Sequence, residues 1–283
     1  MQAPDIVVVG HVTRDLTEAG PRLGGTGAYA GLVAARLGLR VGLLTRCGPE
    51  VDLSALAEAM EVHRLPDPVT TTFENRYVGG RRQQRVPALA GPIGPEDVPD
   101  AWCDAPMLLL GPVAGEVDAG VRERFPRAAV GVCGQGWLRA VGPDGRVEPR
   151  EWSPASLLPG SHVLFVSDED IPWIESREAL LRWADGWPLV AWTHGPGGAD
   201  VWDGGRWLRV PAYPAPEVDP TGAGDSFAAA FLVRWVETQD VAAAARFAAA
   251  ASSFVVAAEG TAGIPSRSQV EDRLRNDPGV LAR

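Results

Sequence analysis

The sequence contains no lysine, and each of its 26 basic residues is an arginine. This absence excludes a lysine Schiff base and the lysine of a P-loop. Cysteine is also scarce, with three residues that are far apart and form no Cys-x-x-Cys pair: Cys47, Cys103 and Cys133. An odd number of scattered cysteines argues against a disulfide framework or a zinc site, and it predicts a reducing compartment, the cytoplasm.

Long apolar runs and an excess of positive charge are missing as well. The longest tract of small apolar residues, 241–258, is interrupted by one arginine and two serines, so it predicts a buried helix rather than a membrane span. The 36 acidic residues outnumber the 26 basic ones and give a formal net charge of −10. This balance argues against nucleic acid or a membrane as a partner. No signal peptide is expected from the first residues, MQAPDIVVVG.

What is present is a regular alternation of short β-branched runs and longer helical patterns, typical of a parallel sheet covered by helices. With 46% hydrophobic residues and no internal repeat, residues 1–283 are expected to form a single α/β domain. The expected strands are 6–10, 41–46, 107–111, 128–133, 162–166 and 189–193. The expected helices are 28–37, 117–125, 173–184, 223–237, 240–259 and 267–275.

The stretch EVDPTGAGDSFAAAF, residues 217–231, places two glycines and two aspartates directly before a helical pattern. Gly222 and Gly224 permit backbone conformations that a β-carbon would forbid, and they let a ligand touch the main chain. A helix that begins near Ala223 would offer the free N–H groups of its first turn, which form an anion site. Asp225 in that turn is expected to stay ionised beside these amides.

An anion site with a carboxylate beside it suits phosphoryl transfer. The amides would hold the phosphate while Asp225 accepts the proton of an attacking hydroxyl. The alternative is a capped helix in which Asp225 only satisfies backbone donors. The two glycines, a second acid at Asp219 and the preceding Pro220-Thr221 favour the functional interpretation.

Several segments along the chain carry a family resemblance. They are GHVTRD (10–15), LGGTGAYAGLVAARLGLRVGLLTRCG (23–48), WTHGPGGADVW (192–202), DPTGAGDSF (219–227) and EGTAGIP (259–265). Together they resemble the PfkB, or ribokinase-like, family of carbohydrate and nucleoside kinases. The resemblance implies a three-layer α/β/α sandwich with a mainly parallel central sheet, and a kinase that uses ATP and Mg²⁺ to phosphorylate a hydroxyl group.

The resemblance also implies roles for individual residues. Asp225 would be the general base. The anion hole for the transferring phosphate would be formed by Gly222, Ala223 and Gly224. ATP would lie against Thr193, Gly195, Gly198, Thr221, Gly222 and Gly224.

Metal binding is implied at two places. The family's Asn-x-x-Glu magnesium motif appears here as Ser167-Asp168-Glu169-Asp170, so Asp170 would supply one oxygen to Mg²⁺ through water. Asp219 and Thr221 would lie near a monovalent cation, as in those members of the family that bind one.

On the acceptor side, Asp15 ends the strand-like VVVGHVTRD at the place where, by the resemblance, family members usually hold substrate hydroxyls. A carboxylate suits a vicinal diol because it accepts two hydrogen bonds, although a solvated loop acid is the alternative. Gly24 and Gly25 would let the backbone approach the same substrate. Tyr29 stands where many sugar-specific members carry asparagine, which puts the ribose or fructose contact in doubt.

A polar hairpin over residues 69–86, with its turn at Gly79-Gly80, is expected to project from the main sheet as a lid. Lid elements are predicted at about 12–24 and 69–90. The hairpin would be the main one, because only eight residues separate Asp15 from Gly24. Asn75 and Arg85 are candidates for closing over the substrate.

The short first arm and the segments LGGTGAYA, TTTFENRYVGGRRQQRV and GQGWLR are most similar to the branch that includes myo-inositol kinases. A cyclitol such as myo-inositol, or a sugar, is therefore the first expectation for the acceptor. The alternatives are a nucleoside kinase and a kinase-like binding or regulatory protein without turnover. A dinucleotide oxidoreductase ranks lower, because no Gly-x-Gly-x-x-Gly follows the first strand. The sequence leaves open whether the protein is a monomer or a homodimer.

Overall fold

The structure, a computed structural model, describes residues 3–78, 81–157 and 159–277. The predicted hairpin turn at Gly79-Gly80 lies outside them. Among the described helices, none is both long and apolar enough to cross a membrane.

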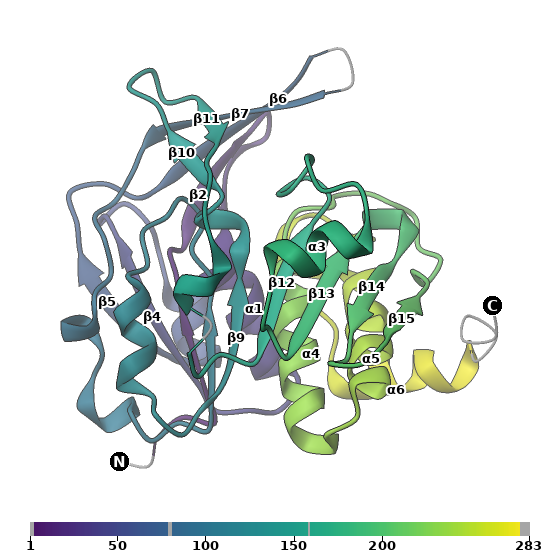
Figure 1. Cartoon of the computed structure of the whole chain (residues 1–283). Helices are drawn as coiled ribbons and strands as arrows, with labels where there is room; N and C mark the ends of the chain where they lie inside the picture. The colour runs from purple at the N-terminus through teal and green to yellow at the C-terminus, as the bar shows by residue number, and fades with distance from the viewer. Residues whose placement is uncertain (1–2, 79–80, 158, 278–283) are drawn as a thin grey trace.

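A nine-stranded sheet runs through the middle of the molecule (Figure 1). Its strands are Ile6–Val9 (β1), Val41–Cys47 (β4), Glu61–Pro66 (β5), Met107–Leu110 (β8), Ala129–Cys133 (β9), Val163–Ser167 (β12), Leu189–Thr193 (β13), Ala199–Trp202 (β14) and Trp207–Val210 (β15). The order is β15-β14-β13-β12-β9-β8-β1-β4-β5, in which β14 pairs antiparallel with both β13 and β15 and the other neighbouring strands pair parallel. Parallel strands need cover on both faces, which explains their continuous apolar sequences.

A second, small sheet has the order β3-β2-β6-β7. Its strands are Thr13–Thr17 (β2), Gly20–Gly24 (β3), Thr72–Val78 (β6) and Arg81–Ala88 (β7). The short first arm therefore supplies two of the four strands, more than expected. Eight residues suffice because Thr17 pairs directly with Gly20 across a two-residue turn. A separate ribbon borders β7, made of Arg139–Val141 (β10) and Val147–Pro149 (β11).

The two faces of the main sheet have different covers. On one face pack Gly25–Arg36 (α1), Ser54–Ala59 (α2), Ala223–Thr238 (α4), Val241–Val255 (α5) and Arg267–Asn276 (α6). The other face is covered by loops together with Arg177–Trp183 (α3) and the 3₁₀ helices Pro95–Asp97 (η1), Asp100–Trp102 (η2), Ala119–Arg124 (η3), Gly134–Gly136 (η4) and Pro154–Leu157 (η5). Two further 3₁₀ turns are Gly195–Gly197 (η6) and Gly260–Gly263 (η7).

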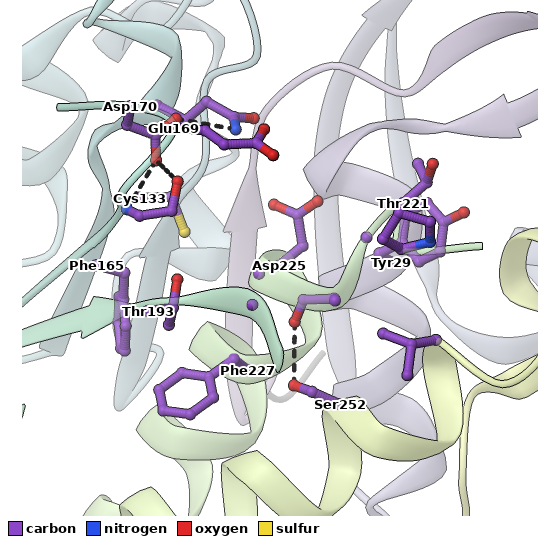
Figure 2. A pocket seen from close by; sticks show the side chains of 18 of the residues that line it. Tyr29, Cys133, Phe165, Glu169, Asp170, Thr193, Thr221, Asp225, Phe227 and Ser252 are labelled. Carbon is purple, nitrogen blue, oxygen red and sulfur yellow. Dashed lines mark hydrogen bonds between the residues drawn. The ribbon is translucent and has the colours of Figure 1, made fainter. Parts of the chain in front are cut away.

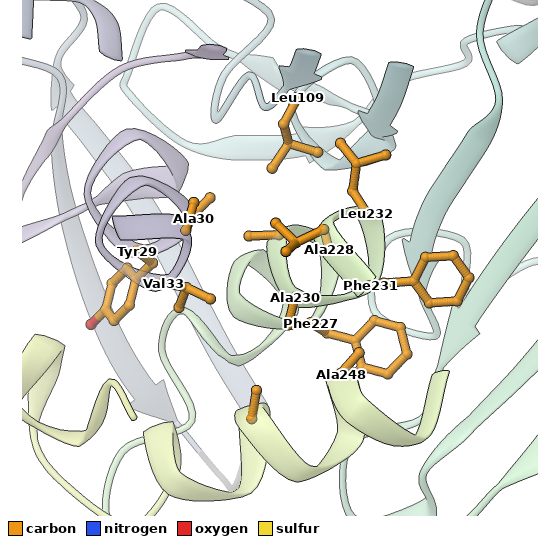
Figure 3. Close-up of a cluster of buried hydrophobic side chains, with 14 of the residues drawn as sticks. Tyr29, Ala30, Val33, Leu109, Phe227, Ala228, Ala230, Phe231, Leu232 and Ala248 are labelled. Carbon is orange, nitrogen blue, oxygen red and sulfur yellow. The ribbon is translucent and has the colours of Figure 1, made fainter. Parts of the chain in front are cut away.

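Alanines let the long helices approach each other closely. Figure 3 shows Ala228 and Ala230 of α4 facing the neighbouring helices, with Ala248 of α5 beside them. Phe231 of α4 packs edge-on against Phe165 of β12, with ring centroids 5.5 Å apart. Truncating such a buried phenylalanine to alanine costs about 3–5 kcal/mol. This packing fixes the N-terminal end of α4 relative to the sheet and to α1.

The predicted fold class, an α/β protein with a mainly parallel central sheet, is confirmed. Two local predictions are wrong. The expected helix over 117–125 is the 3₁₀ helix η3, because the Asp118 side chain accepts the N–H of Gly120 at 2.7 Å and tightens the turn. The segment VVVGHVTRD is not one strand, because β1 ends at Val9 and Asp15 belongs to the small sheet.

Candidate active site

A cleft of about 920 Å³ lies between the small sheet and the C-terminal helices. The carboxyl ends of β9, β12 and β13 border it, as does the N-terminal end of α4. Open parallel sheets bind ligands at this edge. In Figure 2, Asp225 lies in the middle of the cleft, with Glu169 and Asp170 on one side and Thr221 on the other.

Asp225 stands in the first turn of α4, and its Oδ1 accepts a hydrogen bond from Thr26 Oγ1 at 2.6 Å. Burial raises the pKa of this carboxyl to about 6. The Thr26 bond and the charge of Arg139 oppose the rise, while Asp170 and Asp15 add to it. The sequence predicted a carboxylate that stays ionised beside the helix amides, and desolvation opposes this by raising its pKa. At neutral pH the group is still mainly ionised, as a proton acceptor must be.

The glycine turn before Asp225 has the predicted form. Gly222 caps α4 in the left-handed region, with φ of 77°, and a β-carbon on it would strike the ring of Tyr29. Both constraints require glycine. The helix begins at Ala223, and together with Gly222 and Gly224 this residue lines the cleft. The first-turn amides of α4 therefore lie at the cleft, where they can bind an anion.

Tyr29 packs against the glycine turn that precedes Asp225. Its side chain is buried, and its ring packs against Gly222. Burial, together with the nearby carboxylates of Asp219, Asp15 and Asp225, raises the pKa of the Tyr29 phenol far above its usual value. Tyr29 also lines the cleft, so it remains a candidate acceptor contact. Its clearest role in the structure is to hold the anion-binding turn in place.

One end of the cleft is mainly apolar, and we call it the donor end. It is formed by the turn after β13, the segment 212–217 and one side of α5. The predicted ATP-binding residues Thr193, Gly195 and Gly198 all line it. The backbone N–H of His194 donates to the Gly198 carbonyl at 2.8 Å and closes the turn. Other residues here are Ala212, Tyr213, Pro214, Ala215, Ala249, Ser252 and Val256.

The His194 side chain also contacts two acidic residues outside this turn. Its Nδ1 lies 2.9 Å from both carboxylate oxygens of Asp168, and its Nε2 lies 3.4 Å from Oδ2 of Asp200. Asp200 is buried and accepts two hydrogen bonds from Arg177 and one from Arg209. The imidazole thus connects the turn after β13 with the loop after β12.

The other end of the cleft, the acceptor end, is polar and lies against the small sheet. Asp15 of β2 lines it, and its Oδ1 accepts the Thr13 hydroxyl at 2.8 Å. Asn75 of β6 lines it as predicted, and its Oδ1 accepts from Gln84 Nε2 at 2.9 Å. These side chains present several oxygens and nitrogens to a hydroxylated ligand.

Arg85 was predicted to close over the substrate, and the structure contradicts this. Its side chain is exposed and donates to the carbonyl of Asp144 at 2.7 Å, outside the residues that line the cleft. Successive side chains of a strand point to opposite faces. On β7 it is therefore Gln84 that faces the cleft.

Gly24 and Gly25, at the junction of β3 and α1, leave space that neighbouring protein groups occupy. A β-carbon on Gly24 would meet the Asp15 carboxylate, and Gly24 is not among the residues that line the cleft. Gly25 does line the cleft, with φ of 82°, and packs against the carbonyl of His11. The predicted approach of Gly24 to the substrate is thus corrected to a packing role beside Asp15.

Asp170 lines the cleft, but protein donors already hold its carboxylate. Oδ2 accepts from Ser167 N at 3.0 Å and Oγ at 2.8 Å, and Oδ1 accepts from Gln135 Nε2 at 3.1 Å. Glu169 also lines the cleft beside it. Within the described ranges, no group of three or more His, Cys, Asp or Glu side chains could hold a metal ion. Mg²⁺ commonly binds through one or two carboxylates, waters and substrate phosphates, so these oxygens fit it.

Asp219, the second predicted metal ligand, is not among the residues that line the cleft. Its Oδ1 accepts the N–H of Thr221 at 3.0 Å, and its Oδ2 accepts the N–H of Gly260 at 3.1 Å. Burial raises the pKa of Asp219, but these hydrogen bonds outweigh it and leave the pKa below its usual value. Asp219 thus braces the glycine turn against η7. A monovalent cation near it remains a prediction.

Thr26 and Arg139 are among the site residues that sequence reasoning missed. Thr26 follows the Gly-Gly pair, but nothing in the sequence shows that its hydroxyl faces a residue 199 positions later. Arg139 lines the cleft, and its charge lowers the pKa of Asp225. Arg139 belongs to the GQGWLR segment that carried the resemblance, yet no local pattern indicated its partner.

The chain is similar in sequence to kinases of known activity. A family model described as pfkB family carbohydrate kinase matches residues 145–267. Inositol 3-kinase of Oryza sativa subsp. japonica is 33% identical over 291 residues, which cover 92% of this chain and 69% of that protein. Cytidine kinase of Thermococcus kodakarensis is 28% identical over 247 residues, covering 81% of this chain and 87% of that one.

Among solved structures, a pyrophosphate-dependent kinase in the ribokinase family, complexed with a pyrophosphate analog and myo-inositol, superimposes with a TM-score of 0.80. The two are 24% identical, over 94% of this chain and 99% of that one. The fold and the cleft thus define a phosphotransferase that acts on hydroxyl groups. The chain belongs to the pfkB family of carbohydrate kinases, as the sequence predicted.

Proposed function

We propose that this protein transfers the γ-phosphate of ATP to a hydroxyl of a cyclitol such as myo-inositol, or of a similar polyol. The position of Asp225 carries the proposal. It stands at the amide end of α4, between a polar end and an apolar end of one cleft. The inositol 3-kinase relative supports the choice of acceptor.

The reaction follows from the placement of these groups. The acceptor alcohol lies at the polar end. There Asp15 accepts hydrogen bonds from its hydroxyls, and the Asn75 amide can accept or donate them. Its attacking O–H gives its proton to Asp225 as the alcohol oxygen forms a bond to the γ-phosphorus. The bond from that phosphorus to the bridging oxygen breaks, and its electron pair remains on ADP. The first-turn amides of α4 hold the charge on the transferring group.

The apolar end favours a nucleotide over pyrophosphate as the donor. A bare pyrophosphate has no apolar part, whereas Ala212, Pro214 and Val256 offer apolar surface to a purine and ribose. Thr193 and the glycines after it would lie along the phosphate chain. A bound Mg²⁺ would neutralise phosphate charge, and Glu169 and Asp170 are the residues we assign to hold it through water.

The small sheet acts as the lid in this proposal. Its strands border the acceptor end, so its closure would exclude water and protect ATP from hydrolysis. A monovalent cation near Asp219 and a cytoplasmic location remain predictions from the sequence.

The test is a matrix of donors and acceptors. The purified protein is incubated with Mg²⁺ and either ATP or pyrophosphate, against inositols, ribose, fructose, cytidine and adenosine. Phosphorylated product is identified by mass spectrometry. We expect ATP with an inositol to give the highest kcat/KM. Highest turnover with cytidine would favour the nucleoside kinase, in line with the cytidine kinase relative. Binding of acceptors without product from any pair would favour a kinase-like binding protein.

A further inference from the structure

The carboxylate of Asp225, the proposed general base, accepts a hydrogen bond from the Thr26 hydroxyl, a contact that the sequence pattern did not predict. Thr26 Oγ1 donates to Asp225 Oδ1 at 2.6 Å, across the contact between α1 and α4. The Thr26 side chain is 2% exposed, so water does not compete for its hydroxyl. A short hydrogen bond to a carboxylate in such a place is charge-assisted and stronger than one between neutral groups.

The direction of this hydroxyl is fixed by packing. The Thr26 methyl group lies against Gly111 so closely that a β-carbon on Gly111 would strike it. Rotation about χ1 of a threonine moves both its methyl and its hydroxyl to other staggered positions, and tight packing around the methyl opposes that rotation. Gly111 therefore selects the rotamer that aims the hydroxyl at Asp225.

We infer that Thr26 is a positioning residue for the proposed general base. It occupies Oδ1 and so presents Oδ2 of Asp225 to the acceptor hydroxyl, and it favours the ionised carboxylate. The inference rests on the proposed function for its catalytic part. Its structural part, the hydrogen bond that orients the Asp225 carboxylate, does not depend on that function.

Several neighbouring groups affect the ionisation of Asp225. Arg139 of β10 favours the carboxylate, whereas Asp170 after β12 and Asp15 of β2 oppose it. Cys133 of β9 also faces it, but burial raises the pKa of this thiol and keeps it neutral. Tyr29 of α1 is neutral for the same reason. Thr26 of α1 donates a hydrogen bond to this carboxylate.

The test compares Thr26→Val, which keeps the shape but removes the hydroxyl, with Thr26→Ser, which restores it. The carboxyl resonance of Asp225, assigned through Asp225→Asn, is titrated by carbon-13 NMR in the ligand-free chain. A hydrogen bond to a charged group is worth roughly one to two pKa units. We expect the pKa of Asp225 to rise by about one unit in Thr26→Val and to return in Thr26→Ser.

Activity gives the second readout. In Thr26→Val the acid limb of the kcat profile should move to higher pH by the same amount, with kcat at pH 6 reduced about fivefold and the KM for ATP unchanged. Thr45→Val is the matched control, because it removes another buried hydroxyl, one that accepts the N–H of Val12 away from the cleft. It should leave both profiles in place.

The outcomes separate the two claims. An unchanged carboxyl titration in folded Thr26→Val would overturn the inference, whether or not the enzyme turns over. A shifted titration in a protein that phosphorylates none of the acceptors would support the hold on Asp225 and overturn the proposed function instead. If Thr26→Val does not fold, Thr26→Ser and Thr26→Ala are titrated, and an alanine variant with the wild-type pKa would overturn the inference equally.

Discussion

The two ends of the cleft are built from different materials. The acceptor end offers directional polar groups on strands of the small sheet, among them Asp15, Asn75 and Gln84. The donor end offers main-chain turns and small apolar side chains such as Ala249. A site that hydrogen-bonds a hydroxyl rejects an analogue without it by several orders of magnitude, while an apolar pocket discriminates only about 10- to 200-fold. We therefore expect sharp selection among acceptors and loose selection among nucleotide bases.

The largest expected effect comes from the residue where the two ends meet. Asp225→Asn should lower kcat by about 10²–10⁴-fold, because a positioned proton acceptor contributes that much. Binding of ATP and of the acceptor, measured by calorimetry, should change little. Asp185→Asn, at an exposed site outside the cleft, is the control. A kcat for Asp225→Asn within a few-fold of wild type would show that Asp225 is not the proton acceptor.

At the acceptor end, Asp15→Asn should lower kcat/KM for the acceptor by about 10- to 150-fold, the worth of a hydrogen bond to a charged group. The Kd for ATP should not change. Because the charge of Asp15 raises the pKa of Asp225, the acid limb of the kcat profile should also move to lower pH. Equal losses for ATP and acceptor would show that the two ends are not separate.

At the donor end, Val256→Trp should raise the KM for ATP about five- to tenfold, the lower part of what overpacking costs, because the cleft is open and can relax. The KM for the acceptor should stay the same. Val218→Trp is a matched control, since Val218 is 55% exposed and does not line the cleft. If both variants had the same KM for ATP, the nucleotide would not lie at this end.

The smallest effect is on stability. The pKa of Asp225 is about 6 in the folded chain, above the ordinary 3.8. The folded state therefore binds more protons than the unfolded state between these values, and stability falls as pH rises through that window. Asp225→Asn removes this loss and should be more stable than wild type at pH 8 by about 1–2 kcal/mol, allowing for solvent in the cleft. Urea unfolding at pH 4 should show the difference reduced; a constant difference would argue against the raised pKa.

The parts of the molecule with local signals were predictable. The apolar strands, the start of α4 at Ala223 and the glycine at position 222 follow from patterns within a few residues. Contacts across the fold were not. The raised pKa of Asp225 depends on burial and on charges from three other elements, and the Thr26 hydroxyl depends on how α1 crosses α4. Arg85 was misplaced because strand alternation does not reveal which face looks inward.

The joint at Gly24 and Gly25 has a mechanical consequence. β3 ends at the first of these residues and α1 begins at the second, with no spacer between them. The next residue, Thr26, donates a hydrogen bond to the Asp225 carboxylate. If the small sheet tilts when it binds a polyol, the movement therefore reaches Thr26 through a single residue. The orientation of the Asp225 carboxylate can then differ between a filled and an empty acceptor end.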